Sequence, residues 1–291
     1  MRLCRFKQGG GVSLGVVKDG TIYDLTGAKP DIFADLHSAY SYARSTGEGL
    51  VALVGKWMAK AGTVPYRDEI LRIPVVPREV WAAGVTYMRS REARETETSM
   101  KGLYDHVYAA PRPELFVKDG GLRCRGPGDE VCVRSDSKWS VPEPELCVVL
   151  DANCDVIGYT AGDDVSSRDI EGENPLYLPQ AKVYLGSSSI GPVITTPDEI
   201  PDPHSLNISM KITRGGKAAF SGSVNTSQMK RRVEELLRFL KRDNVLGTFT
   251  VLMTGTSIVP PDDFTLKGGD VVEIEIEKIG VLRNTVRQLG Q

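Results

Sequence analysis

The segment SVPEPELCVVLD, at residues 140–151, constrains the fold more than any other part of the chain. Pro142 and Pro144 flank Glu143, and proline both fixes its own φ and excludes the helical conformation from the residue before it. The backbone here is therefore extended. In the ELCVVLD stretch that follows, alternate residues face opposite sides of a strand. We expect a strand that begins with two closely spaced acidic residues.

Most of the chain after residue 78 has the same character, with short strand patterns separated by Gly and Pro. In VVEIEIEKIG (271–280) apolar residues alternate with glutamates, which predicts a half-exposed strand after a turn at 268–270. One helix is expected at residues 229–240, because Met229, Val233, Leu236, Leu237 and Leu240 recur at helical spacing. Its Lys and Arg residues would form a solvated face. These patterns predict a β-rich α+β fold.

The first 74 residues read as a small α+β domain, followed by a catalytic domain at 75–291. Two strand patterns join at Asp19-Gly20, which is a hairpin signal, and a helical stretch covers about 33–60. Pro74 and Pro77 mark the boundary. No chemistry is evident in the first domain, and we expect it to cover the catalytic domain or to build an oligomer interface.

Composition and charge narrow the class of protein. The 291 residues are 41% hydrophobic and carry a net charge of −2, which gives no reason to expect nucleic acid or an anionic membrane as a partner. No apolar run reaches membrane-spanning length, and no secretory signal precedes the first strand pattern. The five cysteines form no CxxC spacing. These features favour a soluble protein of the cytoplasm.

The two glutamates of the opening segment are candidate metal ligands. In an extended chain Glu143 and Glu145 project to the same side, about 6.6 Å apart at Cα. A third acid is available in GYTAGDDVSSRD (158–169), as Asp163, Asp164 or Asp169. Ligation by oxygen alone suits Mg²⁺ or Mn²⁺ rather than zinc. The alternative for so short a motif is a solvated acidic edge.

Two further positions carry possible chemistry. Lys182 lies among apolar residues in LYLPQAKVYLG, where a poorly solvated amine can act as a base or bind a carboxylate; a lysine extending to solvent from a strand edge is the alternative. Gly255-Thr256 offers a tight backbone turn with a hydroxyl, which is more often only a turn. The three histidines lie outside any recognisable motif.

Together these segments resemble the fumarylacetoacetate hydrolase superfamily from about residue 78 to the end. The matching pieces are VWAAGVTY (80–87), PELFVKD (113–119), EPE (143–145), GYTAGDDVSSRD (158–169), QAKVYLGSSSIGPVI (180–194), TGT (254–256) and LKGGDVVEIEIEKIG (266–280). The resemblance implies metal ligation by Glu143, Glu145 and Asp164, with Mg²⁺ as the cofactor or Mn²⁺ in its place. It also implies a substrate-facing role for Lys182 and carboxylate binding at Gly255 and Thr256. The implied fold is a domain of curled mixed β-sheets with a small N-terminal domain, assembled as a homo-dimer or homo-tetramer.

Within the superfamily the chain is most similar to the members that dehydrate 2-keto-3-deoxy sugar acids. Hydrolytic members carry a water-activating histidine a few residues after the position of Tyr87, whereas this chain reads TYMRSREAR there. It also has Glu114, where hydrolytic members have no acid. The resemblance thus implies elimination of water from a 2-keto-3-deoxy pentonate to give 2,5-dioxopentanoate, with Lys182 and Glu114 moving the protons. Substrate-binding candidates are Val85, Thr86, Tyr87 and Arg91, together with Gly255 and Thr256.

Two other readings remain open from the sequence. The first is C–C bond hydrolysis or decarboxylation of an acylpyruvate or oxaloacetate-like acid, which would use the same metal. The second is a non-catalytic, metal-dependent binder of small acids. Arg91 and its neighbour Glu92 could equally form a surface ion pair on a short helix.

Overall fold

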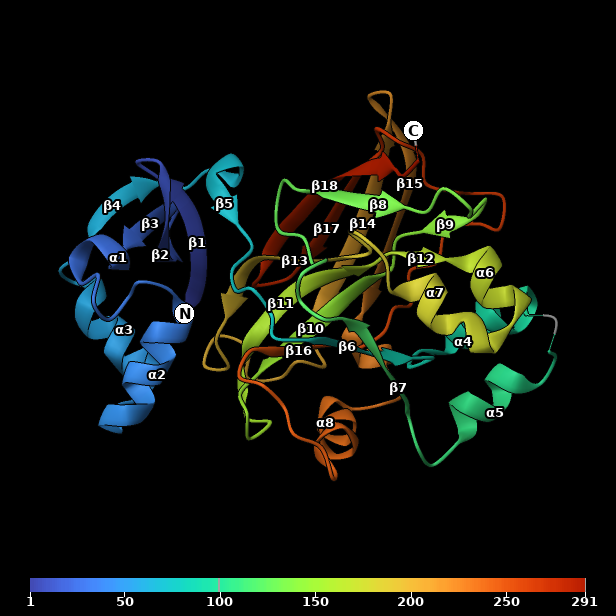
Figure 1. Cartoon of the computed structure of the whole chain (residues 1–291), viewed down its shortest axis with the longest axis horizontal. Helices are drawn as coiled ribbons and strands as arrows, with labels where there is room; N and C mark the ends of the chain where they lie inside the picture. Colours follow the sequence, from blue (N-terminus) through green and yellow to red (C-terminus); the bar gives the residue numbers. More distant parts are fainter. Residues whose placement is uncertain (99, 291) are drawn as a thin grey trace.

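The computed structural model describes residues 1–98 and 100–290, and its strands form two large sheets (Figure 1). The larger sheet has the order β4-β3-β2-β1-β13-β11-β10-β16-β6-β7, with β5 also paired to β1. Its strands are β1 (Arg2–Gln8), β2 (Gly11–Lys18), β3 (Thr21–Asp24), β4 (Gly62–Pro65), β5 (Leu71–Arg72), β6 (Val80–Gly84), β7 (Glu114–Asp119), β10 (Pro144–Leu150), β11 (Val156–Asp164), β13 (Ser188–Thr195) and β16 (Thr250–Met253).

A second sheet, of order β15-β14-β17-β18-β8, packs on the first. Its strands are β8 (Glu130–Val133), β14 (Asn207–Arg214), β15 (Lys217–Asn225), β17 (Val271–Ile276) and β18 (Gly280–Gln288). A short ribbon pairs β9 (Ser140–Val141) with β12 (Ser166–Ser167). In β17 the apolar residues are buried while Glu275 is exposed, so the expected half-exposed strand is confirmed.

Strand β10 occupies the centre of the molecule, as its sequence predicts. Leu146, Val148 and Leu150 belong to the core that lies between the two sheets. Cys147 and Val149 point to the other face, into a core shared with the N-terminal helices. Every residue of β10 is buried, and therefore the two acids at its start are fixed in a rigid part of the fold.

The N-terminal region forms a separate lobe beside the sheet sandwich (Figure 1). It contains β1–β4 and the helices α1 (Leu25–Ala28), α2 (Leu36–Thr46) and α3 (Leu50–Met58), and η1 (Asp68–Ile70) leads into β5. The hairpin expected at Asp19-Gly20 joins β2 to β3. Strand β1 continues the main sheet by pairing with β13, at Arg2↔Thr195 and Leu3↔Ile194. The boundary after residue 74 stays a prediction.

Most of the remaining helices lie at the end of the molecule away from the N-terminal lobe, and the last one lies below the sheets in this view (Figure 1). They are α4 (Met88–Glu97), α5 (Leu103–Ala109), α6 (Arg168–Glu173), α7 (Leu178–Lys182) and α8 (Val233–Lys241), with 3₁₀ turns η2 (Pro175–Tyr177) and η3 (Thr226–Gln228). The combination of mixed sheets with few helices confirms the expected β-rich α+β class.

One local expectation was wrong, and one alternative is excluded. The helix expected from residue 229 begins at Val233, because Met229 instead forms a bridge with Tyr87 and Arg232 is extended. Lys182 is not on a strand edge with its amine in water. It ends helix α7, and its side chain is buried.

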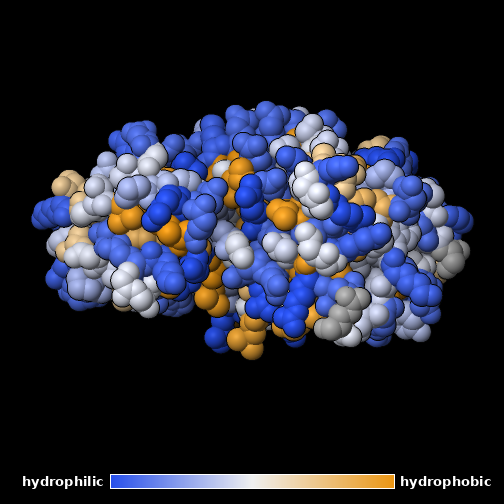
Figure 2. Space-filling view, turned by 90° about the horizontal axis from the view of Figure 1, so that it is seen from above, coloured by the Kyte–Doolittle hydropathy of each residue, from blue (hydrophilic) through white to orange (hydrophobic). Residues whose placement is uncertain are grey.

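The surface is mixed in character. On the face seen in Figure 2, apolar residues lie in small separate groups among polar and charged ones. Within residues 1–98 and 100–290, no helix is long and apolar enough to cross a membrane.

Candidate metal and substrate site

Three carboxylates converge where β10 begins and β11 ends. The two strands run antiparallel with Pro144 opposite Asp163, and the Asp164 backbone N–H donates to the Glu143 carbonyl at 3.0 Å. One carboxylate oxygen each from Glu143, Glu145 and Asp164 lies within 4.8 Å of the others. All three side chains are buried, which contradicts the alternative of a solvated acidic edge. This carboxylate triad offers only oxygen ligands, so its donor set fits Mg²⁺.

The other two acids considered from the sequence have different surroundings. Asp163 points away from the triad and accepts the backbone N–H of Glu143 at 3.0 Å. Burial raises the pKa of Asp163 to about 8. Asp169 accepts from the Ser137 hydroxyl and the Lys138 backbone N–H, at 2.7 Å in each case. Neither joins the group of potential ligands.

Cationic side chains surround Glu143. Its Oε2 lies 2.8 Å from the Lys182 ammonium, which also reaches Asp164 at 3.1 Å. Its Oε1 lies 2.6 Å from Arg94 and 2.7 Å from Arg168. Burial alone would raise the pKa of Glu143, but these three cations hold it well below its usual range. Burial likewise opposes the charge of Lys182, yet Asp164 and Glu143 raise its pKa.

Lys118, which was not predicted from the sequence, contacts the triad at Asp164. Its side chain is completely buried, and its ammonium lies 2.5 Å from Asp164 Oδ1. It also donates to the backbone carbonyls of Lys182 and Val165, at 2.6 and 2.9 Å. Its hydrogen bonds thus go to two carbonyls, and its charge pairs with Asp164. Lys118 therefore fixes both a metal ligand and the segment that presents Lys182.

Gly255, in the segment after β16, fixes Glu145, the remaining carboxylate of the triad. The Gly255 backbone N–H donates to Glu145 Oε2 at 2.5 Å. Gly255 has φ +95°, and a Cβ at this position would lie 2.0 Å from the Thr86 hydroxyl. Only glycine fits this place, because both the backbone conformation and the space exclude a side chain. Burial, with the charges of Asp164 and Glu143, raises the pKa of Glu145 well above its usual range.

The turn from β6 to α4 has a strained backbone beside the triad. Val85 has φ +52°, which is rare for a β-branched residue and is typical of functional sites. Val85 lines the pocket, whereas the Thr86 hydroxyl is directed away and donates to the Thr254 carbonyl at 2.7 Å. Tyr87 is buried, and its hydroxyl has no hydrogen-bond partner among the described residues. The Thr86 hydroxyl is therefore not available to a ligand.

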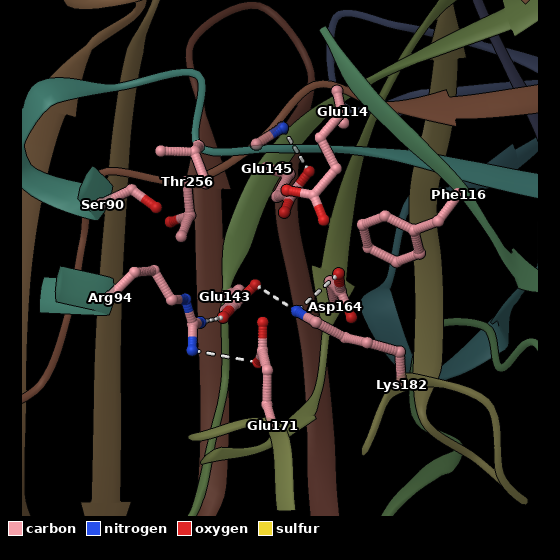
Figure 3. A pocket seen from close by; sticks show the side chains of 14 residues that line it. Ser90, Arg94, Glu114, Phe116, Glu143, Glu145, Asp164, Glu171, Lys182 and Thr256 are labelled. Atoms are coloured by element: carbon pink, nitrogen blue, oxygen red, sulfur yellow. Dashed lines mark hydrogen bonds and ion pairs between the residues drawn. The ribbon is translucent and has the colours of Figure 1, made fainter. Parts of the chain in front are cut away.

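A pocket lined mainly by charged and polar side chains opens onto the triad (Figure 3). The pocket is also lined by Glu114 and Phe116 of β7, Ser90 and Arg94 of α4, and Glu171 of α6. Glu114 points into this space (Figure 3). Burial and the nearby charge of Glu171 raise the pKa of Glu114 to about 7. A carboxyl with this pKa can both donate and accept protons near neutral pH.

The structure brings most of the expected residues to the pocket, with three exceptions. Val85, Glu114, Lys182, Gly255 and Thr256 line it with the triad. Thr86 and Tyr87 are buried and do not line the pocket. Arg91 does not line the pocket. Its guanidinium lies 3.2 Å from Asp105 of α5, so Arg91 forms an ion pair outside the pocket, as the alternative to substrate binding expected. Among the described residues that line the pocket there is no histidine.

Comparison with known proteins agrees with this geometry. The family model "Fumarylacetoacetate (FAA) hydrolase C-terminal" matches residues 80–287, and "Rv2993c-like, N-terminal" matches residues 1–48. The chain belongs to the fumarylacetoacetate hydrolase family. The resemblance read from the sequence motifs is thus confirmed, and so is the fumarylacetoacetate-hydrolase-like fold with curled mixed sheets.

Several members of the fumarylacetoacetate hydrolase family are similar over most of the chain. A probable 2-keto-3-deoxyxylonate dehydratase of Haloferax volcanii is 48% identical over 271 residues, covering 92% of this chain and 93% of its own. A 2-dehydro-3-deoxy-D-arabinonate dehydratase of Saccharolobus solfataricus is 51% identical over 219 residues, covering 74% of each chain. A solved structure of 2-keto-3-deoxy-D-arabinonate dehydratase, complexed with magnesium and 2,5-dioxopentanoate, superimposes with a TM-score of 0.84. It is 40% identical, and the match covers both chains completely.

Sequence reasoning missed four charged residues of the site. They are Arg94, Lys118, Arg168 and Glu171. Glu114 and Lys118 occur four residues apart in PELFVKD, so the resemblance of that segment was the one available signal for Lys118. Arg94, Arg168 and Glu171 lie in polar helical stretches that look like solvated surface. Only the packing of α4 against α6 places them inside.

Proposed function

We propose that the protein is a magnesium-dependent hydro-lyase that converts a 2-keto-3-deoxy pentonate, such as 2-keto-3-deoxy-D-arabinonate, to 2,5-dioxopentanoate and water. The observation that carries this proposal is the buried carboxylate triad, in a chain 40% identical over its whole length to a dehydratase solved with magnesium and that product. Glu143, Glu145 and Asp164 would hold the metal. When bound, Mg²⁺ supplies a Lewis acid that draws electrons from the 2-oxo group and acidifies the hydrogens at C3.

The protein's own groups then move protons and position the substrate. Lys182 and Glu114 face the same pocket and are the proton-transfer groups. One proton leaves C3 and the C4–O bond breaks with release of water. A second proton leaves C5 and one returns to C3, and the resulting enol becomes the aldehyde. Which group acts at C3 is left open by the proposal.

The carboxylate of the substrate would be bound by backbone N–H groups. Val85, with its strained backbone, and Thr256 both line the pocket. An anion at this place would accept hydrogen bonds from fixed donors that need no rearrangement. Because α4 begins two residues later, at Met88, the positive end of that helix also faces this region.

The test is turnover of 2-keto-3-deoxy-D-arabinonate with Mg²⁺, followed through an NADP-linked aldehyde dehydrogenase that consumes 2,5-dioxopentanoate. We expect a signal that a chelator abolishes and that Glu143→Gln reduces at least 100-fold. Acylpyruvates and oxaloacetate serve as the alternative substrates. Rapid cleavage of these acids, without turnover of the deoxy keto acid, would replace the dehydratase with a C–C hydrolase or decarboxylase.

We also propose that the chain forms a homo-oligomer in the cytoplasm. Leu176, Tyr177 and Leu185 lie exposed around α7, and exposed apolar side chains are typical of contact surfaces. All five cysteines are free and buried, which fits a reducing compartment. Light scattering on the eluting protein should give twice or four times the mass of one chain, and a single-chain mass would contradict the assembly.

A further inference from the structure

Glu171 is an acid of the pocket that none of the roles above uses. It lies on α6, its side chain is only 7% exposed, and it lines the pocket with Glu114 and Lys182. Figure 3 shows Glu114 and Glu171 reaching into the same space from opposite sides. Both acids are distinct from the triad, so a ligand held at the triad would extend between them.

The carboxylate of Glu171 is fixed but incompletely bonded. Its Oε2 lies 3.0 Å from Arg94 Nη1, yet it accepts no hydrogen bond from any described residue. A buried carboxylate oxygen without a donor costs free energy, and such atoms are uncommon in folded proteins. Arg94 supplies the countercharge, which leaves Glu171 as an acceptor for a donor that comes from the ligand.

The ligand of the proposed function brings such donors. A 2-keto-3-deoxy pentonate has a 2-oxo acid end that suits the triad and, beyond C3, hydroxyl groups at C4 and C5. The C4 hydroxyl must leave with an added proton, and the partly buried Glu114 carboxyl can donate one. The C5 hydroxyl stays on the carbon chain during the elimination, and it therefore needs an acceptor rather than an acid.

We infer that Glu171, held in place by Arg94, accepts a hydrogen bond from the C5 hydroxyl of the substrate and thereby selects sugar acids over unsubstituted 2-oxo acids. This inference rests on the proposed function and deepens it. An ionised acceptor strengthens a hydrogen bond, and a site built to bond a hydroxyl discriminates against analogues that lack it. Glu171 is thus a specificity-determining residue.

A pair of inert ligands isolates this contact. 5-Hydroxy-2-oxopentanoate and 2-oxopentanoate both present the 2-oxo acid end and differ in the terminal hydroxyl, and neither has a leaving group at C4. We would measure their affinities by calorimetry in saturating Mg²⁺. Wild-type protein should bind the hydroxylated acid about tenfold more tightly or better, as a hydrogen bond to a charged group implies. Glu171→Gln should weaken that ligand about tenfold and leave 2-oxopentanoate nearly unchanged.

Glu97 provides the matched control. It bonds Arg94 and Arg168 in the same buried network, with its side chain 3% exposed, but it does not line the pocket. Glu97→Gln therefore disturbs the arginines without removing a ligand contact, and it should change both affinities by the same factor. Glu171→Asp keeps the charge and shortens the reach, so it should lose selectivity while remaining folded.

The outcomes separate the two proposals. Equal weakening of both ligands in Glu171→Gln, or the same loss of selectivity in Glu97→Gln, would overturn the role of Glu171 while wild-type turnover of the deoxy keto acid still supports the dehydratase. If wild-type protein neither bound these acids nor turned over the deoxy keto acid, the proposed function would fail, and this inference with it.

Discussion

Removal of the Lys118 ammonium should destabilise the fold and weaken metal binding together. In Lys118→Met the aliphatic part of the side chain is kept, but the carbonyls of Val165 and Lys182 lose their donor and Asp164 loses the adjacent positive charge. Breaking a buried ion pair from one side costs about 3–5 kcal/mol. For a chain of this size the melting temperature should fall by about 5–8 °C. Freed from Lys118, Asp164 is less well oriented, and the affinity for Mg²⁺ should fall about 10–100-fold.

Both quantities are measurable on one preparation. Thermal unfolding in the presence of a chelator gives the change in stability without a contribution from the metal, and calorimetric titration with Mg²⁺ gives the affinity. Lys138→Met is the control, because Lys138 is an exposed lysine of the neighbouring loop whose ammonium makes no bond in the described structure. This control should shift the melting temperature by less than about 2 °C.

A Lys118→Met protein with wild-type melting temperature and wild-type Mg²⁺ affinity would refute the reasoning. Loss of stability with unchanged affinity would instead mean that Asp164 is oriented by β11 alone. The two measurements thus distinguish a structural role for Lys118 from one that reaches the metal ligand.

Three other perturbations follow from the site. The pKa of Glu114 is about 7 against an ordinary 4.5, so the folded protein binds this proton more tightly than the unfolded chain does. The free energy of unfolding of wild type, relative to Glu114→Gln, should therefore be greatest below pH 4.5. It should decline by about 2 kcal/mol, allowing for partial exposure, as the pH rises through 7, and urea unfolding measures it. A pH-independent difference would contradict this environment. Gly255→Ala should lose about 1–3 kcal/mol of stability and most activity, because the added Cβ meets the Thr86 hydroxyl. Gly62 has open space around it, so Gly62→Ala should change the free energy of unfolding little in the same assay. Mg²⁺ at 100 times its Kd should stabilise the wild-type protein by about 2.7 kcal/mol in thermal unfolding and should do so much less in Glu143→Gln.

The sequence was sufficient for those parts of the fold that depend on local chemistry. Prolines on either side of Glu143 fix an extended backbone, and the alternation that follows defines β10, so two ligands of the triad could be placed without a structure. The third was different. Spacing alone left Asp163, Asp164 and Asp169 as equal candidates, and the resemblance favoured Asp164. The pairing of β10 with β11 explains why, since Asp163 turns away and Asp164 faces Glu143.

What the sequence could not supply is the packing between distant segments. Arg94 and Arg168 sit on polar helices, and a helical pattern with so many charges predicts solvent exposure. They are buried because each finds a carboxylate, Glu97 or Glu143, from another element. The start of α8 was misplaced for the same reason, since Met229 has helical spacing but a contact with Tyr87 decides its conformation.

The pairing of β1 with β13 places the N-terminal lobe against one edge of a strand of the catalytic region. Strand β13 is bonded on one side to β11, and on the other side to β1 at two positions near its end. An uncovered strand presents free N–H and C=O groups that can recruit another chain. The lobe covers the β13 edge at these two positions. A catalytic region produced without it should therefore aggregate even though every residue that touches the pocket is still present.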